Sequence, residues 1–95
     1  MTKADIINDV SKQTGFTKVE VEIMLDSVIN SIKASLANGE RVDMRGFGSF
    51  LVKRREARNT RNPATNEIFK LDARYIPSFK VSKILKEYVN KNLIN

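Results

Sequence analysis

The residues best suited to chemistry in this chain lie between Lys53 and Glu67, and the chemistry they suit is anion binding. This stretch has no large apolar side chain, and its five cationic residues are Lys53, Arg54, Arg55, Arg58 and Arg61. Its centre, Asn62-Pro63-Ala64-Thr65-Asn66, has the composition of a turn. Because such a segment has almost nothing to bury against its own protein, we expect it to form a β-hairpin arm that lies on an anionic partner.

Composition excludes most catalytic chemistry. The 95 residues include no Cys and no His, which removes disulfides, thiolate chemistry, the usual zinc ligands and the usual general base. The sequence also has no phosphate-binding loop and no recognisable pair of catalytic carboxylates. We therefore predict that the protein is not an enzyme and has no cofactor, no metal and no small-molecule substrate.

Two further patterns bear on location. No apolar run approaches the roughly 20 residues of a membrane span. The segment after Met1 is polar, so no signal peptide is evident. We expect no membrane partner and a cytoplasmic location.

The charge is unevenly distributed along the chain. Residues 1–40 hold four Lys against six acids, whereas residues 41–95 hold thirteen Lys or Arg against five acids. The formal net charge is +6 and the sequence pI is about 9.8. A basic second half favours a polyanionic partner, with nucleic acid as the leading case, although a merely solubilising surface has the same charge.

The first half of the chain predicts two helices. Thr2 with Asp5 resembles a capping box, and Gly15 is expected to end the first helix in a left-handed cap. Thr17-Lys18-Val19-Glu20 is a capping box that opens a second helix, which Asn38-Gly39 ends. The second helix carries apolar residues at three- and four-residue steps, at Val21, Met24, Leu25, Val28, Ile29, Ile32 and Leu36. One short helix cannot cover so wide a stripe, so we expect a second copy of the chain to do so.

From Arg41 the apolar period changes to two, which predicts strands. Gly46-Phe47-Gly48 is expected to form a tight turn, and Tyr75 to Val81 a strand whose Pro77 indicates a sheet edge or a bulge. Ser82 is placed to cap a last helix. The spacing of Phe47, Phe50 and Phe79 favours core positions over base stacking. The predicted class is therefore α+β.

This order of elements and several motifs resemble the HU and integration host factor family of bacterial DNA-bending proteins. The motifs are Arg45-Gly46-Phe47-Gly48-Ser49-Phe50, Arg61-Asn62-Pro63, and Pro77-Ser78-Phe79-Lys80 leading to Lys83 and Lys86. The resemblance covers essentially the whole chain, as one domain over residues 1–95. It implies an intertwined dimer with a helical base (1–40), saddle strands (41–52 and 75–81), a DNA-binding β-arm (53–74) and a C-terminal helix (82–95).

The resemblance also implies a function and a set of contacts. The expected function is to bind duplex DNA through the minor groove and bend it, mostly without reading sequence, in the bacterial nucleoid. Pro63 is the expected intercalating wedge, because its ring is rigid and has no N–H to satisfy. The expected DNA-binding residues are Lys3, Arg45, Lys53, Arg55, Arg58, Arg61, Asn62, Pro63, Asn66, Lys80, Lys83 and Lys86. Strict strand alternation places Arg55 and Arg61 on one side of the arm and Arg58 on the other.

Three points stay open at this stage. The acid at Asp43, two residues before Arg45, resembles the β subunit of integration host factor, so a site-specific DNA-bending subunit is an alternative. The protein is expected to be a homodimer, with a heterodimer as the other possibility. A protein that binds RNA has the same charge and is the alternative from another class.

Overall fold

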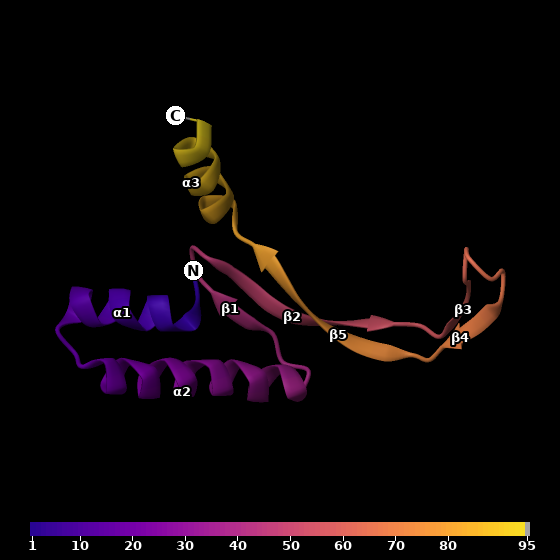
Figure 1. Cartoon of the computed structure of the whole chain (residues 1–95), viewed down its shortest axis with the longest axis horizontal. Helices are drawn as coiled ribbons and strands as arrows, with labels where there is room; N and C mark the ends of the chain where they lie inside the picture. The colour runs from indigo at the N-terminus through magenta and orange to yellow at the C-terminus, as the bar shows by residue number, and fades with distance from the viewer. Residues whose placement is uncertain (95) are drawn as a thin grey trace. The chain divides into compact units, whose positions relative to one another are not determined.

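The computed structural model describes residues 1–94 and contains helices and strands in the predicted order (Figure 1). The elements are α1 (Lys3–Thr14), α2 (Lys18–Ala37), β1 (Val42–Met44), β2 (Gly48–Arg55), β3 (Arg58–Arg61), β4 (Ile68–Leu71), β5 (Arg74–Val81) and α3 (Lys83–Ile94). The predicted α+β class is confirmed. The last helix was predicted over 82–95, and position 95 lies outside the described residues. The chain divides into two compact units, Met1–Ser35 and Leu36–Asn95, which are described separately below.

Both N-terminal helices begin at the predicted capping boxes. In α1, the Asp5 backbone N–H donates to the Thr2 hydroxyl (3.3 Å) and the Thr2 N–H donates to the Asp5 carboxylate (2.8 Å). Before α2, Thr17 and Glu20 make the same reciprocal pair, at 3.2 and 3.1 Å. Gly15 ends α1 with φ of 81°, the left-handed conformation that glycine adopts without a steric penalty. The structure confirms these predictions. They could be made from sequence because each cap depends only on a few neighbouring residues.

The second unit is built on an antiparallel sheet with strand order β1-β2-β5. Gly46, with φ of 82°, forms the predicted turn between β1 and β2, where the Phe47 N–H donates to the Met44 carbonyl oxygen (2.9 Å). Strand β5 lies at one edge of this sheet, and Pro77 pairs with Val52 on its inner neighbour. The edge position predicted from Pro77 is confirmed.

The hairpin arm is interrupted on both strands, so strict strand alternation does not run along its whole length. Strands β2 and β5 stay paired as far as Arg55 and Arg74, and pairing resumes at Arg58 and Leu71 between β3 and β4. Glu56-Ala57 and Asp72-Ala73 stand between the two sheets. Glu, Ala and Asp are all depleted in strands, which gives a physical reason for the paired interruption.

The three phenylalanines predicted to take core positions contact one another as one cluster. The Phe79 ring lies 5.3 Å from the Phe47 ring and 5.0 Å from the Phe50 ring, measured between centroids. The cluster is incomplete within one chain, because Phe47 and Phe79 remain 49% and 42% exposed. Among the described residues, Val21 is the only buried hydrophobic side chain, and it is 3% exposed. A single chain therefore lacks a core of ordinary size.

Candidate nucleic-acid interface

The tip of the arm is a turn held by Asn62. Its side-chain oxygen accepts from the Ala64 backbone N–H (2.9 Å), and its carbonyl oxygen accepts from the Asn66 N–H (2.7 Å). The Asn62 N–H donates to the Glu67 carbonyl oxygen (2.8 Å) and closes the loop. Asn66 has φ of 65°, a left-handed conformation that Asn tolerates better than most residues. In this geometry the side-chain NH₂ group of Asn62 can donate to a ligand, and Pro63 is exposed at the end of the hairpin.

Two of the predicted arm contacts come together where the strands are interrupted. Arg55 and Arg58 line one pocket with Glu56 and Arg74. The prediction that strict alternation separates Arg55 from Arg58 was wrong, because the strand does not continue from one to the other. We call residues 55–58 and 71–74 the arm elbow.

Beyond the elbow, alternation does hold. Arg58 pairs with Leu71 and Arg61 pairs with Ile68 in the β3–β4 ladder. Residues three apart on one strand face opposite sides, so Arg58 and Arg61 lie on opposite faces of this ribbon. Lys53 is not part of this ribbon, because it lies on β2, where it pairs with Ile76 of β5.

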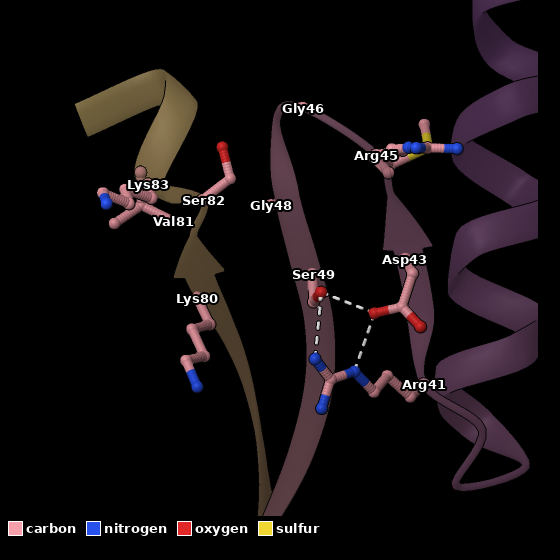
Figure 2. Close-up of a pocket in the computed structure, with 11 residues that line it drawn as sticks. Arg41, Asp43, Arg45, Gly46, Gly48, Ser49, Lys80, Val81, Ser82 and Lys83 are labelled. Atoms are coloured by element: carbon pink, nitrogen blue, oxygen red, sulfur yellow. Dashed lines mark hydrogen bonds and ion pairs between the residues drawn. The ribbon is translucent and has the colours of Figure 1, made fainter. Parts of the chain in front are cut away.

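A second group of predicted residues lies beside the sheet. Figure 2 shows this pocket, which contains the predicted contacts Arg45, Lys80 and Lys83. Two lysines come from the end of β5 and the start of α3, and Arg45 follows β1. The Ser82 hydroxyl accepts from the Leu85 N–H (3.0 Å), so the predicted cap fixes the start of α3 beside Lys83.

The same pocket holds a network of three polar side chains (Figure 2). The Asp43 carboxylate accepts from the Ser49 hydroxyl (2.5 Å) and from the Arg41 Nε (2.7 Å), and a second Arg41 nitrogen lies 3.2 Å from the Ser49 oxygen. The hydrogen bond from Ser49 and that from Arg41 lower the pKa of Asp43 below its ordinary value of 3.8. Asp43 therefore holds the guanidinium of Arg41 across β1 and β2, and its hydrogen bonds go to Arg41 and Ser49 rather than to Arg45.

Two predicted contacts lie outside these groups. The Lys3 ammonium is 2.5 Å from the Asp26 carboxylate within the first unit, and this hydrogen bond raises the pKa of Lys3. Lys86 lies in α3 and does not line the pocket beside the sheet. Its backbone N–H donates to the Ser82 carbonyl oxygen (3.0 Å). The structure thus places nine of the twelve predicted residues at four points of the second unit, which are the arm tip (Asn62, Pro63 and Asn66), β3 (Arg61), the elbow (Arg55 and Arg58) and the pocket beside the sheet (Arg45, Lys80 and Lys83). Lys53 and Lys86 line neither pocket, and Lys3 belongs to the first unit.

The predicted set missed two arginines. Arg41 lines the pocket beside the sheet, and Arg74 lines the elbow pocket. Alternation carried a signal for Arg41, since it shares a strand face with Asp43 and Arg45. Arg74 gave no such signal, because only the register of β2 with β5 places it opposite Arg55.

Comparison with known proteins decides the family. A family model described as "Bacterial DNA-binding protein" matches residues 1–90. The chain belongs to this family. Its relatives include both HU and integration host factor, so the resemblance stated from the motifs is confirmed. The relatives are DNA-binding proteins and not enzymes, in agreement with the prediction.

The family's two branches are about equally similar to this chain. Integration host factor subunit beta of Marinobacter nauticus is 42% identical over 94 residues, which cover 98% of this chain and 96% of that protein. HU of Thermus thermophilus is 41% identical over 91 residues, covering 96% and 94%. HU of Staphylococcus aureus (strain COL) is 45% identical over 89 residues, covering 94% and 99%.

Solved structures of the family agree with the fold. The Anabaena HU–DNA cocrystal structure matches with a TM-score of 0.86 and 32% identity, covering 94% of this chain and 97% of that one. HU from Thermotoga maritima matches with a TM-score of 0.66 and 32% identity, covering 94% and 98%. Within residues 1–94, no helix is long and apolar enough to cross a membrane, and no cluster of acidic side chains could hold a metal ion.

Proposed function

We propose that this member of the family binds duplex DNA as a dimer, through arms that enter the minor groove, and bends it by inserting Pro63 between base pairs. The observation that carries this proposal is the arm tip. A hydrogen-bonded turn presents an exposed proline at the end of a hairpin whose strands carry Arg58, Arg61 and Lys70. Proline suits intercalation because it is apolar and has no N–H that would lose a hydrogen bond in the base stack. The Anabaena relative was crystallised with DNA, which supports the same partner here.

The cationic groups suit a partner recognised through its backbone. Guanidinium groups are planar, weakly hydrated and always charged, which favours a narrow electronegative groove and phosphate oxygens. In this proposal Arg55, Arg58, Arg61, Asn62 and Asn66 bind along the arm. Lys53 binds at the start of the arm, and Lys3, Arg45, Lys80, Lys83 and Lys86 hold phosphates along the body. Binding through phosphates is largely independent of sequence.

The proposed dimer follows from the exposed apolar surface of one chain. Helix α2 exposes Ile23, Met24, Val28 and Ile29 by 41–61%, and α3 exposes Ile84, Tyr88, Val89 and Leu93 by 45–81%. Soluble proteins rarely leave such faces uncovered. In this division of the chain, residues 1–40 form the dimer base, 41–52 and 75–81 the saddle, 53–74 the arm and 82–95 a further helix. Binding to DNA places the protein in the bacterial nucleoid.

A site-specific role is the second candidate, favoured by one observation. Asp43 and Ser49 fix the Arg41 guanidinium in the pocket that Arg45 also lines, and a positioned arginine can discriminate between sequences that a mobile one treats alike. The integration host factor subunit among the relatives is as similar as the HU proteins.

Competition binding separates these functions. A labelled duplex is bound in the presence of unlabelled random DNA, of an enriched candidate site, or of an RNA duplex of equal length and ionic strength. The proposed function predicts equal competition by both DNAs and weaker competition by RNA. Much stronger competition by the enriched site means site-specific binding, and stronger competition by the A-form RNA overturns the DNA proposal.

A further inference from the structure

The arm elbow is a point where the two sheets of the second unit meet. Arg55 and Arg74 form the last pair of the β2–β5 ladder, and Arg58 and Leu71 form the first pair of the β3–β4 ladder. The intervening residues on the two sides therefore face each other across the hairpin. An interruption on both strands at one level exposes backbone and side chains that a continuous ribbon would pair.

Three guanidinium groups meet at this point. Arg55, Arg58 and Arg74 line one pocket, and all three side chains are exposed. Like charges directly opposite each other on an antiparallel pair are destabilising, and Arg55 and Arg74 stand in that relation. Within the described part of the chain, none of the three has a hydrogen bond or an ion pair to another side chain. The elbow therefore carries three positive charges that no side chain of the described residues neutralises.

The nearby acid is held by a different residue. Glu56 also lines the pocket, yet its carboxylate forms an ion pair with the Arg54 guanidinium. Alternation places Arg54 and Arg55 on opposite faces of β2. The Arg54 ion pair thus occupies the one carboxylate that lines the pocket and leaves the three arginines unneutralised.

We propose that Arg55, Arg58 and Arg74 form a binding site for a DNA backbone phosphate at the arm elbow, and that Arg54 is a positioning residue that keeps Glu56 from filling it. This site rests on the proposed function, since the anion is taken from bound DNA. A phosphodiester suits it because its two free oxygens accept from several guanidinium N–H groups at once. The site adds Arg74 to the DNA contacts and gives Arg54 a role without direct contact to DNA.

The first test measures the affinity of the full-length protein for a random duplex as a function of salt. Arg74→Gln is expected to weaken binding about fivefold and to lower the magnitude of the slope of log K against log salt by about 0.9, the value for one phosphate. Lys33→Gln, on α2, removes the same charge outside the pocket and the predicted contacts, so it should leave both values unchanged. If the wild-type protein binds and Arg74→Gln has the same affinity and the same salt slope, the elbow site is rejected while the proposed function stands. Wild-type protein that fails to bind overturns the proposed function.

The second test isolates the role of Arg54 in a double-mutant cycle. Arg54→Gln frees Glu56 to neutralise the pocket, so binding is expected to weaken about fivefold, and Arg54→Gln/Glu56→Gln is expected to restore wild-type affinity or better. Lys70→Gln removes one arm charge elsewhere and is expected to show no rescue by Glu56→Gln. Equal rescue of Lys70→Gln and Arg54→Gln would mean that Glu56 only repels DNA at long range, and the positioning role would be rejected.

A third comparison separates a DNA phosphate from a free one. At equal ionic strength, inorganic phosphate is expected to compete with the duplex no better than chloride, because the site is completed by the path of the bound DNA. Competition by inorganic phosphate in the wild type that is lost in Arg74→Gln would indicate a free-anion site and overturn the assignment to DNA.

Discussion

Gly48 lies directly beneath the ring of Phe79, so closely that no larger residue fits. A β-carbon at position 48 would stand 2.7 Å from the Phe79 Cε1 and 2.6 Å from the Lys80 carbonyl oxygen. Gly48 is buried and pairs with Val81, while Phe79 contacts both other phenylalanines of the cluster. Because Gly48 has no side chain, the aromatic cluster can close over β2. The close packing of β5 on β2 in turn positions Lys80, at the end of β5, and Lys83, at the start of α3.

Gly48→Ala is expected to destabilise the folded protein by about 1–3 kcal/mol, because either the ring or the β5 backbone must move. Thermal unfolding followed by circular dichroism measures this change. The double variant Gly48→Ala/Phe79→Leu should cost less than the sum of the two single variants, since the smaller side chain relieves part of the clash. Additive effects would show that the two residues do not share the space described here.

Asp43 predicts a pH dependence with a defined sign. Its folded-state pKa lies below 3.8 because it accepts hydrogen bonds from Ser49 and from Arg41. A lowered carboxyl pKa stabilises the fold above the ordinary value and loses this contribution as the pH falls through the folded-state pKa.

The variant Ser49→Ala removes the larger cause of this shift, so the pKa of Asp43 is expected to rise toward 3.8. Carboxyl carbon chemical shifts followed by NMR from pH 2 to 6 report the change. Asp5, whose pKa is lowered by Thr2 in α1, serves as the internal control and should not move. An unaltered Asp43 titration would contradict the hydrogen bond from Ser49.

The exposed face of α2 predicts that folding and dimerisation are one process. Val28 is 47% exposed in the single chain, and Val28→Asp would place a charge in the proposed interface. We expect this variant to lose the dimer and most of its structure, as measured by sedimentation and circular dichroism. Asn30→Asp adds the same charge at an exposed polar position and should behave as the wild type.

The wild-type protein offers a second readout of the same claim. Its midpoint of thermal unfolding should rise with protein concentration, because the dimer is favoured by mass action. A midpoint independent of concentration, together with a folded Val28→Asp monomer, would contradict the obligate dimer.

Charge removal on β3 should change the salt dependence of DNA binding. Each of Arg58→Gln and Arg61→Gln is expected to lower the magnitude of the slope of log K against log salt by about one, as for the loss of one phosphate contact. Lys33→Gln, on α2, removes the same charge outside the predicted contacts and is the control. Slopes unchanged in both arginine variants would mean that these residues do not touch phosphates.

Much of the fold was predictable from sequence because its signals are local. The capping boxes at Thr2 and Thr17, the left-handed Gly15 and the turn at Gly46 each depend on a few neighbouring residues. The motif around Arg61-Asn62-Pro63 further identified the family and the arm tip.

The details that sequence analysis missed are set by pairing across strands. The interruption at Glu56 and Asp72 requires weak strand formers on both sides of the hairpin at the same level, which only the register reveals. Arg74 became a candidate DNA contact only once the register had placed it opposite Arg55. The network that directs Asp43 to Arg41 depends on Ser49, which is six residues away in sequence but directly opposite on the neighbouring strand.

The most direct test of the account measures whether the protein bends DNA through Pro63. A short duplex labelled at both ends is titrated with wild-type protein and with Pro63→Ala at low and high salt, and end-to-end fluorescence transfer is recorded. We expect the wild type to draw the ends together at low salt and to release the DNA at high salt, because affinity depends on counterion release. We also expect Pro63→Ala to bind somewhat more weakly and to bend the duplex distinctly less, since the wedge is lost. Tight binding with no approach of the ends, or equal bending by both proteins, would contradict the intercalating role of Pro63.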